Sequence, residues 1–237
     1  MSSIKGIIFD YGGTIDTNGI HWGELIWQEY VKAGVNVTKE SFRNAYVHGE
    51  RELAKHPIIE PTDTFHTLLR KKMNIQFLYL KENSHLACTG KEQEVAEGCY
   101  RRVLDTIAVT RPIIENFSRK YPMVLVTNFY GNMAVVLKEF GLNGMFKEVI
   151  ESSVVGLRKP DPALFALGVG ALGVKGEEIA VVGDSYRKDI HPALQLGCKA
   201  VWLKRLCWSE EDIIEGFEPT ATTNNFEELP HIIEQFK

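Results

Sequence analysis

The chain has 237 residues, of which 44% are hydrophobic and 24% are charged. This composition is typical of an ordinary soluble globular protein, and the length suits one large domain or a core with a smaller inserted domain. The formal net charge of −4 argues against a nucleic-acid surface. No segment reaches the roughly 18 apolar residues that a membrane span needs.

The N-terminus lacks the basic-then-apolar pattern of a signal peptide, so we expect a cytoplasmic protein. The cysteines form no Cys-x-x-Cys pair and sit inside apolar patterns, which indicates buried free thiols in a reducing compartment. They are Cys88, Cys99, Cys198 and Cys207.

Short apolar runs rich in β-branched residues predict buried strands. Each run is nearly continuous rather than alternating, which is typical of strands covered on both faces. The runs are Ile4–Phe9, Met123–Val126, Phe146–Ile150, Ile179–Val182 and Ala200–Leu203. Helical patterns separate the last four: one is expected to begin at Pro112, and another at Asp161-Pro162, a cap followed by proline at the first helical position. Alternating strands and helices predict an α/β fold with a doubly wound parallel sheet.

The first two strands are separated by about a hundred residues, far more than one crossover helix needs. Amphipathic helical patterns fill this interval. We therefore predict an inserted all-helical cap domain over residues 16–105, with residues 1–15 and 106–237 forming the core. Within the cap, Arg70-Lys71-Lys72 is interpreted as the solvated face of a helix.

Polar residues follow three of the predicted strands. Asp10 ends the first, Thr127-Asn128 ends the second, and Asp184 follows the fourth. In an open parallel sheet, ligands bind beyond the carboxyl ends of the strands, so we expect these side chains to meet there. Lys159 precedes a proline, which predicts an extended loop just ahead of a helix and close to the same edge.

The chemistry of this group points to phosphate and a hard cation. Asp10 and Asp184 offer carboxylates to Mg²⁺, and a backbone carbonyl of the Gly12-Gly13 turn can supply a further ligand. Lys159 adds positive charge for a dianion. The free N–H groups of the glycine turn, with Thr127 and Asn128, add donors to phosphate oxygens. Asp10 could then attack phosphorus and form an aspartyl-phosphate that water cleaves.

Four motifs together resemble the haloacid dehalogenase superfamily of hydrolases over essentially the whole chain: "FDYGGT", "VLVTN", "GLRKPDP" and "VVGDSYRKDI". The resemblance implies a Rossmann-like core with a helical, C1-type cap between the first two motifs. It implies Asp10 as nucleophile and Mg²⁺ ligand, and Asp184 as a second metal ligand. It implies Thr127 and Asn128 as phosphate binders and Lys159 as the charge that steadies nucleophile and phosphate. Asp189 resembles the family's further acid, which holds a metal-bound water or orients Lys159.

Gly12 departs from the family pattern. The resemblance implies a second aspartate at this position, which protonates the leaving oxygen and then activates water. Loss of a general acid typically costs about 10²–10⁴ in rate. The backbone carbonyl of Gly12 can still bind Mg²⁺, so the departure bears on efficient phosphomonoester hydrolysis and not on metal or phosphate binding.

Two explanations keep phosphoryl transfer. Either another acid replaces the missing one, with Asp16, His21 and Glu24 as candidates just beyond the turn, or the substrate has a good leaving group such as an acyl phosphate. An exposed or helix-capping role is the alternative for His21.

Other chemistries stay open. The family's dehalogenases also lack the second aspartate and use no metal, but Asp184 beside Asp10 then gains nothing, because the two carboxylates would raise each other's pKa. Phosphonate hydrolysis would want an imine-forming lysine in the cap, and nothing singles one out among Lys32, Lys39 and Lys55. A catalytically weak binding or regulatory protein is the alternative of another class.

The sequence therefore predicts a Mg²⁺-dependent phosphatase for a small soluble phosphate, since a closing helical cap excludes macromolecules. Cap residues would choose the substrate, and the polar or aromatic candidates are His21, Trp22, Arg43, His48 and Arg51. The sequence indicates neither the substrate nor the oligomeric state.

Overall fold

The computed structural model describes residues 3–83, 90–209 and 212–236. Parallel strands form one sheet in the order β3-β2-β1-β4-β5-β6. The strands are β1 (Gly6–Phe9), β2 (Met123–Thr127), β3 (Glu148–Glu151), β4 (Ile179–Gly183), β5 (Lys199–Leu203) and β6 (Ala221–Thr223). The five apolar runs coincide with β1 to β5, which confirms the α/β prediction. The sequence did not indicate β6, because its Ala-Thr-Thr stretch is short and lacks an apolar run.

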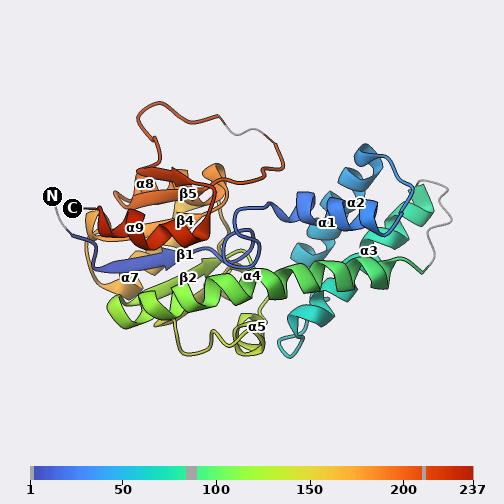
Figure 1. The fold of residues 1–237 in the computed structure, drawn as a ribbon, viewed down its shortest axis with the longest axis horizontal. Coiled ribbons are helices and arrows are strands. Elements are labelled where there is room, and N and C mark those ends of the chain that lie inside the picture. Colours follow the sequence, from blue (N-terminus) through green and yellow to red (C-terminus); the bar gives the residue numbers. More distant parts are fainter. Residues whose placement is uncertain (1–2, 84–89, 210–211, 237) are drawn as a thin grey trace.

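Helices cover the sheet on both faces and also form a separate body beside it (Figure 1). They are α1 (Trp22–Lys32), α2 (Lys39–Lys55), α3 (Phe65–Asn83), α4 (Glu92–Lys120), α5 (Met133–Glu139), α6 (Ser152–Val155), α7 (Pro162–Leu172), α8 (His191–Gln195) and α9 (Leu229–Glu234). Shorter helical turns are η1 (Gly176–Glu178), η2 (Tyr186–Ile190) and η3 (Phe226–Glu228). As predicted, Asp161 caps α7 by accepting a hydrogen bond from the Ala163 amide at 2.9 Å, with Pro162 at the first helical position.

Strand residues alternate between the two faces of the sheet, and each face buries its own apolar cluster. On one face Ile8 and Val124 pack with Phe165 of α7 and with α8. On the other face Phe9 and Leu125 pack with residues of α4 and α9. This second cluster continues into the helical body, so the core and the body share one hydrophobic interior.

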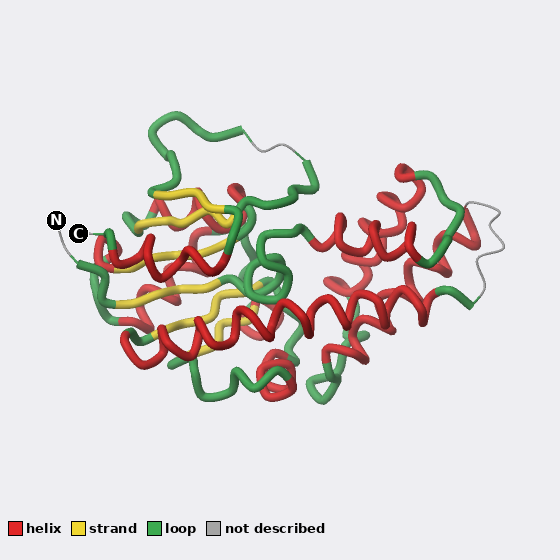
Figure 2. Tube along the Cα trace, viewed as in Figure 1, coloured by secondary structure: helices red, strands yellow, loops and turns green. Residues whose placement is uncertain are grey.

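The helical body consists of α1, α2, α3 and the first half of α4, which pack against one another. The strands of the described residues all lie in the other part of the molecule (Figure 2). α4 contributes to both parts: Val103 is buried in the helical body, and Phe117 is buried near the sheet. Its 29 residues span roughly 44 Å at 1.5 Å per residue.

The expectation that a helix begins at Pro112 is wrong, because Pro112 lies inside α4. Proline removes one backbone hydrogen bond within a helix and typically costs about 3 kcal/mol. Ala108, whose carbonyl loses its partner, is exposed and accessible to water. Buried Ile107 and Ile114 pack the helix on either side of the proline. α4 therefore runs unbroken past residue 105, where the sequence suggested the cap would end.

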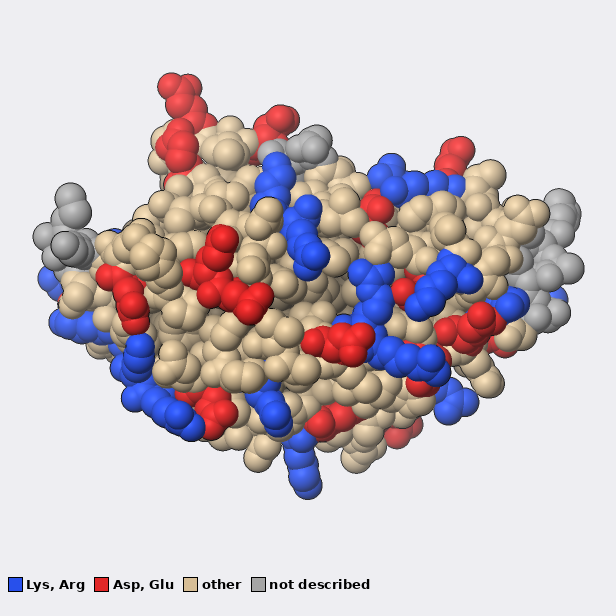
Figure 3. Space-filling view, in the orientation of Figure 1, with Lys and Arg blue, Asp and Glu red and all other residues tan. Residues whose placement is uncertain are grey.

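The surface shown in Figure 3 carries basic and acidic side chains intermixed over both parts of the molecule. Among the described residues, no helix is long and apolar enough to cross a membrane. Cys99 and Cys198 are buried free thiols, as expected, and Cys207 is half-buried. Cys88 lies outside the described residues.

Candidate active site

The carboxyl ends of β2, β1 and β4 are neighbours in the sheet, and the predicted polar residues meet there. The Asp10 amide donates to the Val182 carbonyl at 2.9 Å, which extends the pairing of β1 with β4 by one residue. Asp10, Thr127 and Asp184 line one cavity. Chain topology thus explains why residues more than a hundred positions apart share a site.

Lys159 joins two carboxylates of this site. Its Nζ lies 2.6 Å from Asp10 Oδ1 and 2.7 Å from Asp189 Oδ1, and the residue is only 4% exposed. Burial lowers the pKa of Lys159, but the two carboxylates more than offset this and raise the pKa above its ordinary value. Lys159 is therefore a fixed positive charge beside Asp10. Its contact with Asp189 is the one that an orienting role, one of the two roles that the resemblance implied, would require.

Asn128 holds the Lys159 loop in place. Its Nδ2 donates to the Lys159 carbonyl at 3.1 Å, and its Oδ1 accepts from the Lys159 amide at 2.9 Å. Each end of the Asn128 amide thus has a backbone partner on Lys159, and Nδ2 carries a second N–H beyond the one that these two bonds use. Thr127 is buried at the end of β2, and like Asn128 it lines the cavity.

Three carboxylates crowd this end of the cavity around a single buried lysine. Ligand oxygens of Asp10, Asp184 and Asp189 lie within 4.8 Å of one another. Burial raises the pKa of Asp10 to about 6, against the effect of Lys159, and burial together with Asp189 and Asp10 raises the pKa of Asp184 well above its ordinary value. These residues fit a hard divalent cation, because oxygen ligands and uncompensated negative charge are what Mg²⁺ requires.

The glycine turn lets Asp184 approach Asp10. Gly13 has φ +101°, and a Cβ built there would lie 2.3 Å from Asp184 Oδ2. A side chain at Gly13 would therefore both strain the backbone and displace the carboxylate. The Gly13 amide was expected to be free for phosphate, but it donates to Asp16 Oδ1 at 2.7 Å.

Trp22 lies next to the position of the missing second aspartate. A Cβ at Gly12 would meet the Trp22 indole at 3.8 Å, which is ordinary van der Waals contact. The indole Nε1 donates to Asp16 Oδ2 at 2.9 Å, so the Asp16 carboxylate holds both Trp22 and Gly13. Burial raises the pKa of Asp16 to about 7.

Of the three candidate replacement acids, only His21 lines the cavity. Asp16 is fully buried with both oxygens engaged, and Glu24 pairs with Lys39 at 2.9 Å. His21 also caps α1, because its Nδ1 accepts from the Gly23 amide at 3.0 Å. Burial lowers the pKa of His21 to about 4, so the imidazole is neutral near pH 7 and presents Nε2–H as a donor.

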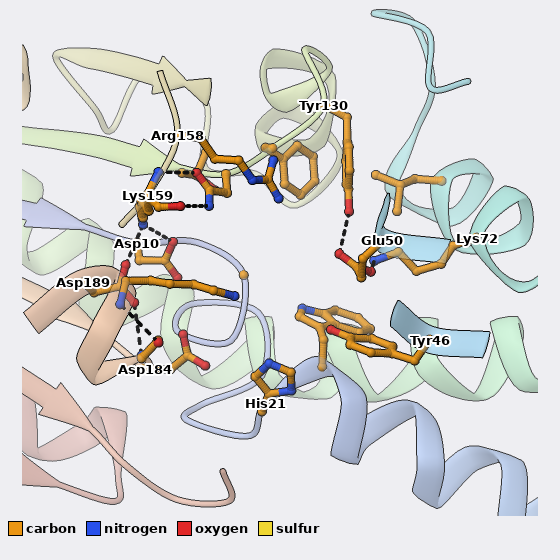
Figure 4. A pocket seen from close by; sticks show the side chains of 18 of the residues that line it. Asp10, His21, Tyr46, Glu50, Lys72, Tyr130, Arg158, Lys159, Asp184 and Asp189 are labelled. Carbon is orange, nitrogen blue, oxygen red and sulfur yellow. Dashed lines mark hydrogen bonds and ion pairs between the residues drawn. The ribbon is translucent and has the colours of Figure 1, made fainter. Parts of the chain in front are cut away.

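The far side of the cavity was not predicted from the sequence. Figure 4 shows Tyr46, Glu50, Lys72 and Tyr130 facing the Asp10 group across the cavity, and apolar residues of α3 complete the lining. The interpretation of Lys72 as solvated is wrong: it is 5% exposed and its Nζ lies 2.7 Å from Glu50 Oε1. A signal existed, because Lys72 follows Phe65 by seven positions and so shares its buried helix face.

The cap candidates divide into two groups. His21 and Trp22 line the cavity. Arg43 does not: its Nη2 donates to the Trp208 carbonyl at 3.0 Å, and its guanidinium lies over the Trp208 ring at 4.8 Å. His48 stacks on Tyr79 outside the cavity, and Arg51 is exposed.

The structure combines a parallel sheet, an acidic group around a buried lysine, and an inserted helical body. This combination is typical of one class of hydrolases. A family model described as haloacid dehalogenase-like hydrolase matches residues 4–197. The chain therefore belongs to the haloacid dehalogenase-like hydrolases, as the motifs indicated.

Three of the curated relatives are phosphatases by name. Phosphoglycolate phosphatase from Pectobacterium atrosepticum is 32% identical over 98% of this chain and 94% of its own. Glyceraldehyde 3-phosphate phosphatase from Methanocaldococcus jannaschii is 34% identical over 43% of each chain. Phosphoserine phosphatase from Thermus thermophilus is 46% identical over 27% of this chain and 26% of its own. The chain thus spans less than half the length of the last two.

Solved structures share the fold. The HAD-hydrolase YfnB from Bacillus subtilis, solved bound to magnesium, has a TM-score of 0.61 at 18% identity, with 98% of this chain and 99% of that chain covered. The L-2-haloacid dehalogenase RSc1362 has a TM-score of 0.64 at 18% identity, with coverage of 98% and 100%. At these identities the similarity concerns the fold alone.

Proposed function

We propose that this protein is a Mg²⁺-dependent phosphatase that acts on a small phosphate ester through an aspartyl-phosphate at Asp10. The observation that carries the proposal is the buried Lys159 bridge between Asp10 and Asp189, with Asp184 alongside. The phosphatase relatives, including one aligned over nearly the whole chain, support the same reaction class.

The chain's own residues prepare Asp10 for attack. Lys159 fixes Oδ1, and the Thr14 hydroxyl donates to Oδ2 at 3.0 Å, so the carboxylate is held from both sides. An Asp10 oxygen forms a bond to phosphorus while the bond to the ester oxygen breaks, and water later cleaves the acyl phosphate. Asp10, Asp184 and the Gly12 carbonyl would hold Mg²⁺, and the bound cation would supply positive charge to the phosphate oxygens.

The leaving oxygen lacks the usual acid at position 12: among the described residues only Trp22 lies within 4 Å of a Cβ built at Gly12, and its N–H is engaged with Asp16. We infer that esters with good leaving groups react fastest, because they depart without a proton. Neutral His21 offers a hydrogen bond at Nε2 but is a weak acid.

The other chemistries are less well supported. Asp184 beside Asp10 favours a bound cation over metal-free attack on carbon. Among the lysines considered for an imine, Lys39 pairs with Glu24 and Lys32 with Glu29, and Lys55 is exposed and does not line the cavity. Lys72 does reach the cavity, but Glu50 outweighs the effect of burial and holds its pKa above the ordinary value. A protonated amine does not form an imine.

Hydrolysis of para-nitrophenyl phosphate and acetyl phosphate, with and without Mg²⁺, tests the proposal in wild type, Asp10→Asn and the exposed control Asp105→Asn. The expected result is Mg²⁺-dependent turnover in wild type and in the control, lost in Asp10→Asn, with acetyl phosphate the faster substrate. Equal turnover in Asp10→Asn would overturn it.

A further inference from the structure

The wall of the cavity opposite Asp10 carries a buried ion pair. We call this wall the distal wall and define it by its residues, which are Trp22, Tyr46, Glu50, Lys72 and Tyr130. Lys72 Nζ lies 2.7 Å from Glu50 Oε1, and the Tyr130 hydroxyl donates to Glu50 Oε2 at 3.2 Å. Lys72 comes from α3, Glu50 from α2 and Tyr130 from the loop after β2, so cap and core both contribute (Figure 4).

Stability alone does not explain this pair. Burying two charges costs desolvation free energy, and an apolar pair of similar volume is often as stable or more so. Apolar packing is available at this place, because Phe65, Leu68 and Leu69 are buried beside Lys72 on the same helix. A charged pair retained on the wall of a cavity suggests that it contacts a ligand.

The charges of the distal wall cancel. Burial raises the pKa of Glu50, but Lys72 more than offsets this and leaves it below the ordinary value. Both partners are therefore charged near neutral pH, with a net charge of zero. A second anionic group on the substrate would meet Glu50. Arg158 and Lys188 also line the cavity, and Lys188 helps Lys72 to hold the pKa of Glu50 down. Both come from the core, next to Lys159 and Asp189 in sequence, and we assign their charge to the phosphate.

An ammonium group on the substrate fits no better. The aromatic faces that would hold it already face Lys72, whose Nζ lies 5.8 Å from the Trp22 ring centroid and 5.7 Å from the Tyr130 ring centroid. A second cation there would be repelled by Lys72.

A hydroxyl group satisfies both charges at once, because it donates to a carboxylate and accepts from an ammonium. Apart from its ion pair with Lys72, Glu50 Oε1 is buried and accepts no hydrogen bond from any described residue. Tyr46 and Trp22 add flat apolar surface for carbon-bound hydrogens. The cavity, with a volume of about 110 Å³, suits a ligand of a few carbons.

We propose that the distal wall binds hydroxyl groups of the leaving alcohol, so that the substrate is the monophosphate of a short polyhydroxylated alcohol or sugar, without a second acid or an amine. This inference rests on the proposed phosphatase function. Gly12 slows all alkyl esters alike, so selectivity among alkyl phosphates reports on the distal wall while absolute rate does not.

The test compares kcat/KM for sn-glycerol 3-phosphate, propyl phosphate, phosphoglycolate and phosphoethanolamine, with para-nitrophenyl phosphate as a general probe. We expect glycerol 3-phosphate to exceed each other alkyl ester by at least about tenfold, the usual effect of a hydrogen bond to a charged group. A higher kcat/KM for phosphoglycolate or phosphoethanolamine, or an equal kcat/KM for propyl phosphate, would overturn this inference but not the proposed phosphatase function. Wild type that hydrolyses nothing, the general probe included, overturns the proposed function and the inference together.

Variants locate the selectivity. In the double variant Glu50→Gln/Lys72→Met, the ratio of kcat/KM for glycerol 3-phosphate over propyl phosphate should fall about tenfold. Matched controls on the same helices are Glu52→Gln and Lys71→Met, whose side chains pair with His56 and Asp63 outside the cavity; both should keep the wild-type ratio. An unchanged ratio in the folded double variant contradicts the proposal. If that variant does not fold, Tyr130→Phe is used instead, because it removes only the hydroxyl group. This variant should also lower the ratio, and an unchanged ratio would contradict the proposal.

Discussion

Lys159 and Asp10 are 149 positions apart in sequence and 2.6 Å apart between Nζ and Oδ1. The contact is buried on both sides, and Asn128 fixes the backbone that carries the lysine. A positive charge is therefore held at Asp10, the proposed nucleophile, before any substrate arrives, which is the preorganisation that electrostatic catalysis requires.

Replacing Lys159 should abolish this arrangement. Lys159→Met removes the only lysine paired with Asp10 and Asp189 in the described structure, so turnover of acetyl phosphate should fall by at least about 100-fold. Steady-state kinetics measures the loss. The control is Lys175→Met, on the surface near η1, which should behave as wild type. A Lys159→Met enzyme within threefold of wild type would contradict a catalytic role.

Gly13→Ala tests whether the turn makes room for Asp184. Its Cβ would lie 2.3 Å from Asp184 Oδ2, so the carboxylate must move and Mg²⁺ affinity, measured by calorimetry, should fall at least about tenfold. Gly144→Ala is the matched control: its φ of +77° imposes the same kind of backbone strain, but nothing lies within 4 Å of the added Cβ. It should lose about 1 kcal/mol of stability and keep Mg²⁺ affinity. Equal affinities in both variants would show that the close contact does not matter.

Gly12→Asp should restore an acid to the site. The added Cβ meets only Trp22, at 3.8 Å, so a small side chain fits. Hydrolysis of an alkyl phosphate should rise by about 10- to 100-fold, as general acid catalysis predicts, whereas acetyl phosphate should change little because its leaving group needs no proton. Gly12→Asn has nearly the same shape and no acid, and it should give no gain. A gain with asparagine would assign the effect to packing.

His21 should make stability depend on pH on the acid side. Its pKa is about 4 in the folded protein, below the ordinary value near 6.5, because burial disfavours the charged ring. Between these values the unfolded chain binds the proton and the folded chain does not, so His21 lowers stability as pH falls from 7 to 4.5. Thermal unfolding of His21→Asn, which keeps a capping side chain, should show a smaller loss over this range than wild type. An equal loss in both proteins would exclude His21 as the source.

The core and its catalytic edge were predictable from sequence for a clear physical reason. Buried parallel strands read as short apolar runs, and topology brings their carboxyl ends together, so the placement of Asp10, Thr127 and Asp184 followed. The sequence did not predict that α4 is continuous, because a proline normally begins or breaks a helix. Tertiary packing lets α4 pass through Pro112.

The remaining differences involve side chains whose partners are distant in sequence. Asn128 binds the backbone of Lys159, Gly13 is engaged by Asp16, and Lys72 meets Glu50 from another helix. Local pattern specifies a helix face but not the residue that it meets across a cavity. For Lys72 the helical periodicity indicated a buried position, whereas its charge suggested a position exposed to solvent.

The most direct test of the central claim is to find the phosphate on Asp10. Protein mixed with radiolabelled acetyl phosphate and Mg²⁺ is quenched in acid, digested, and the labelled peptide identified. We predict label on the peptide that contains Asp10, dependent on Mg²⁺ and absent in Asp10→Asn. Turnover of acetyl phosphate with no label on that peptide, or with equal label in Asp10→Asn, would contradict the aspartyl-phosphate mechanism.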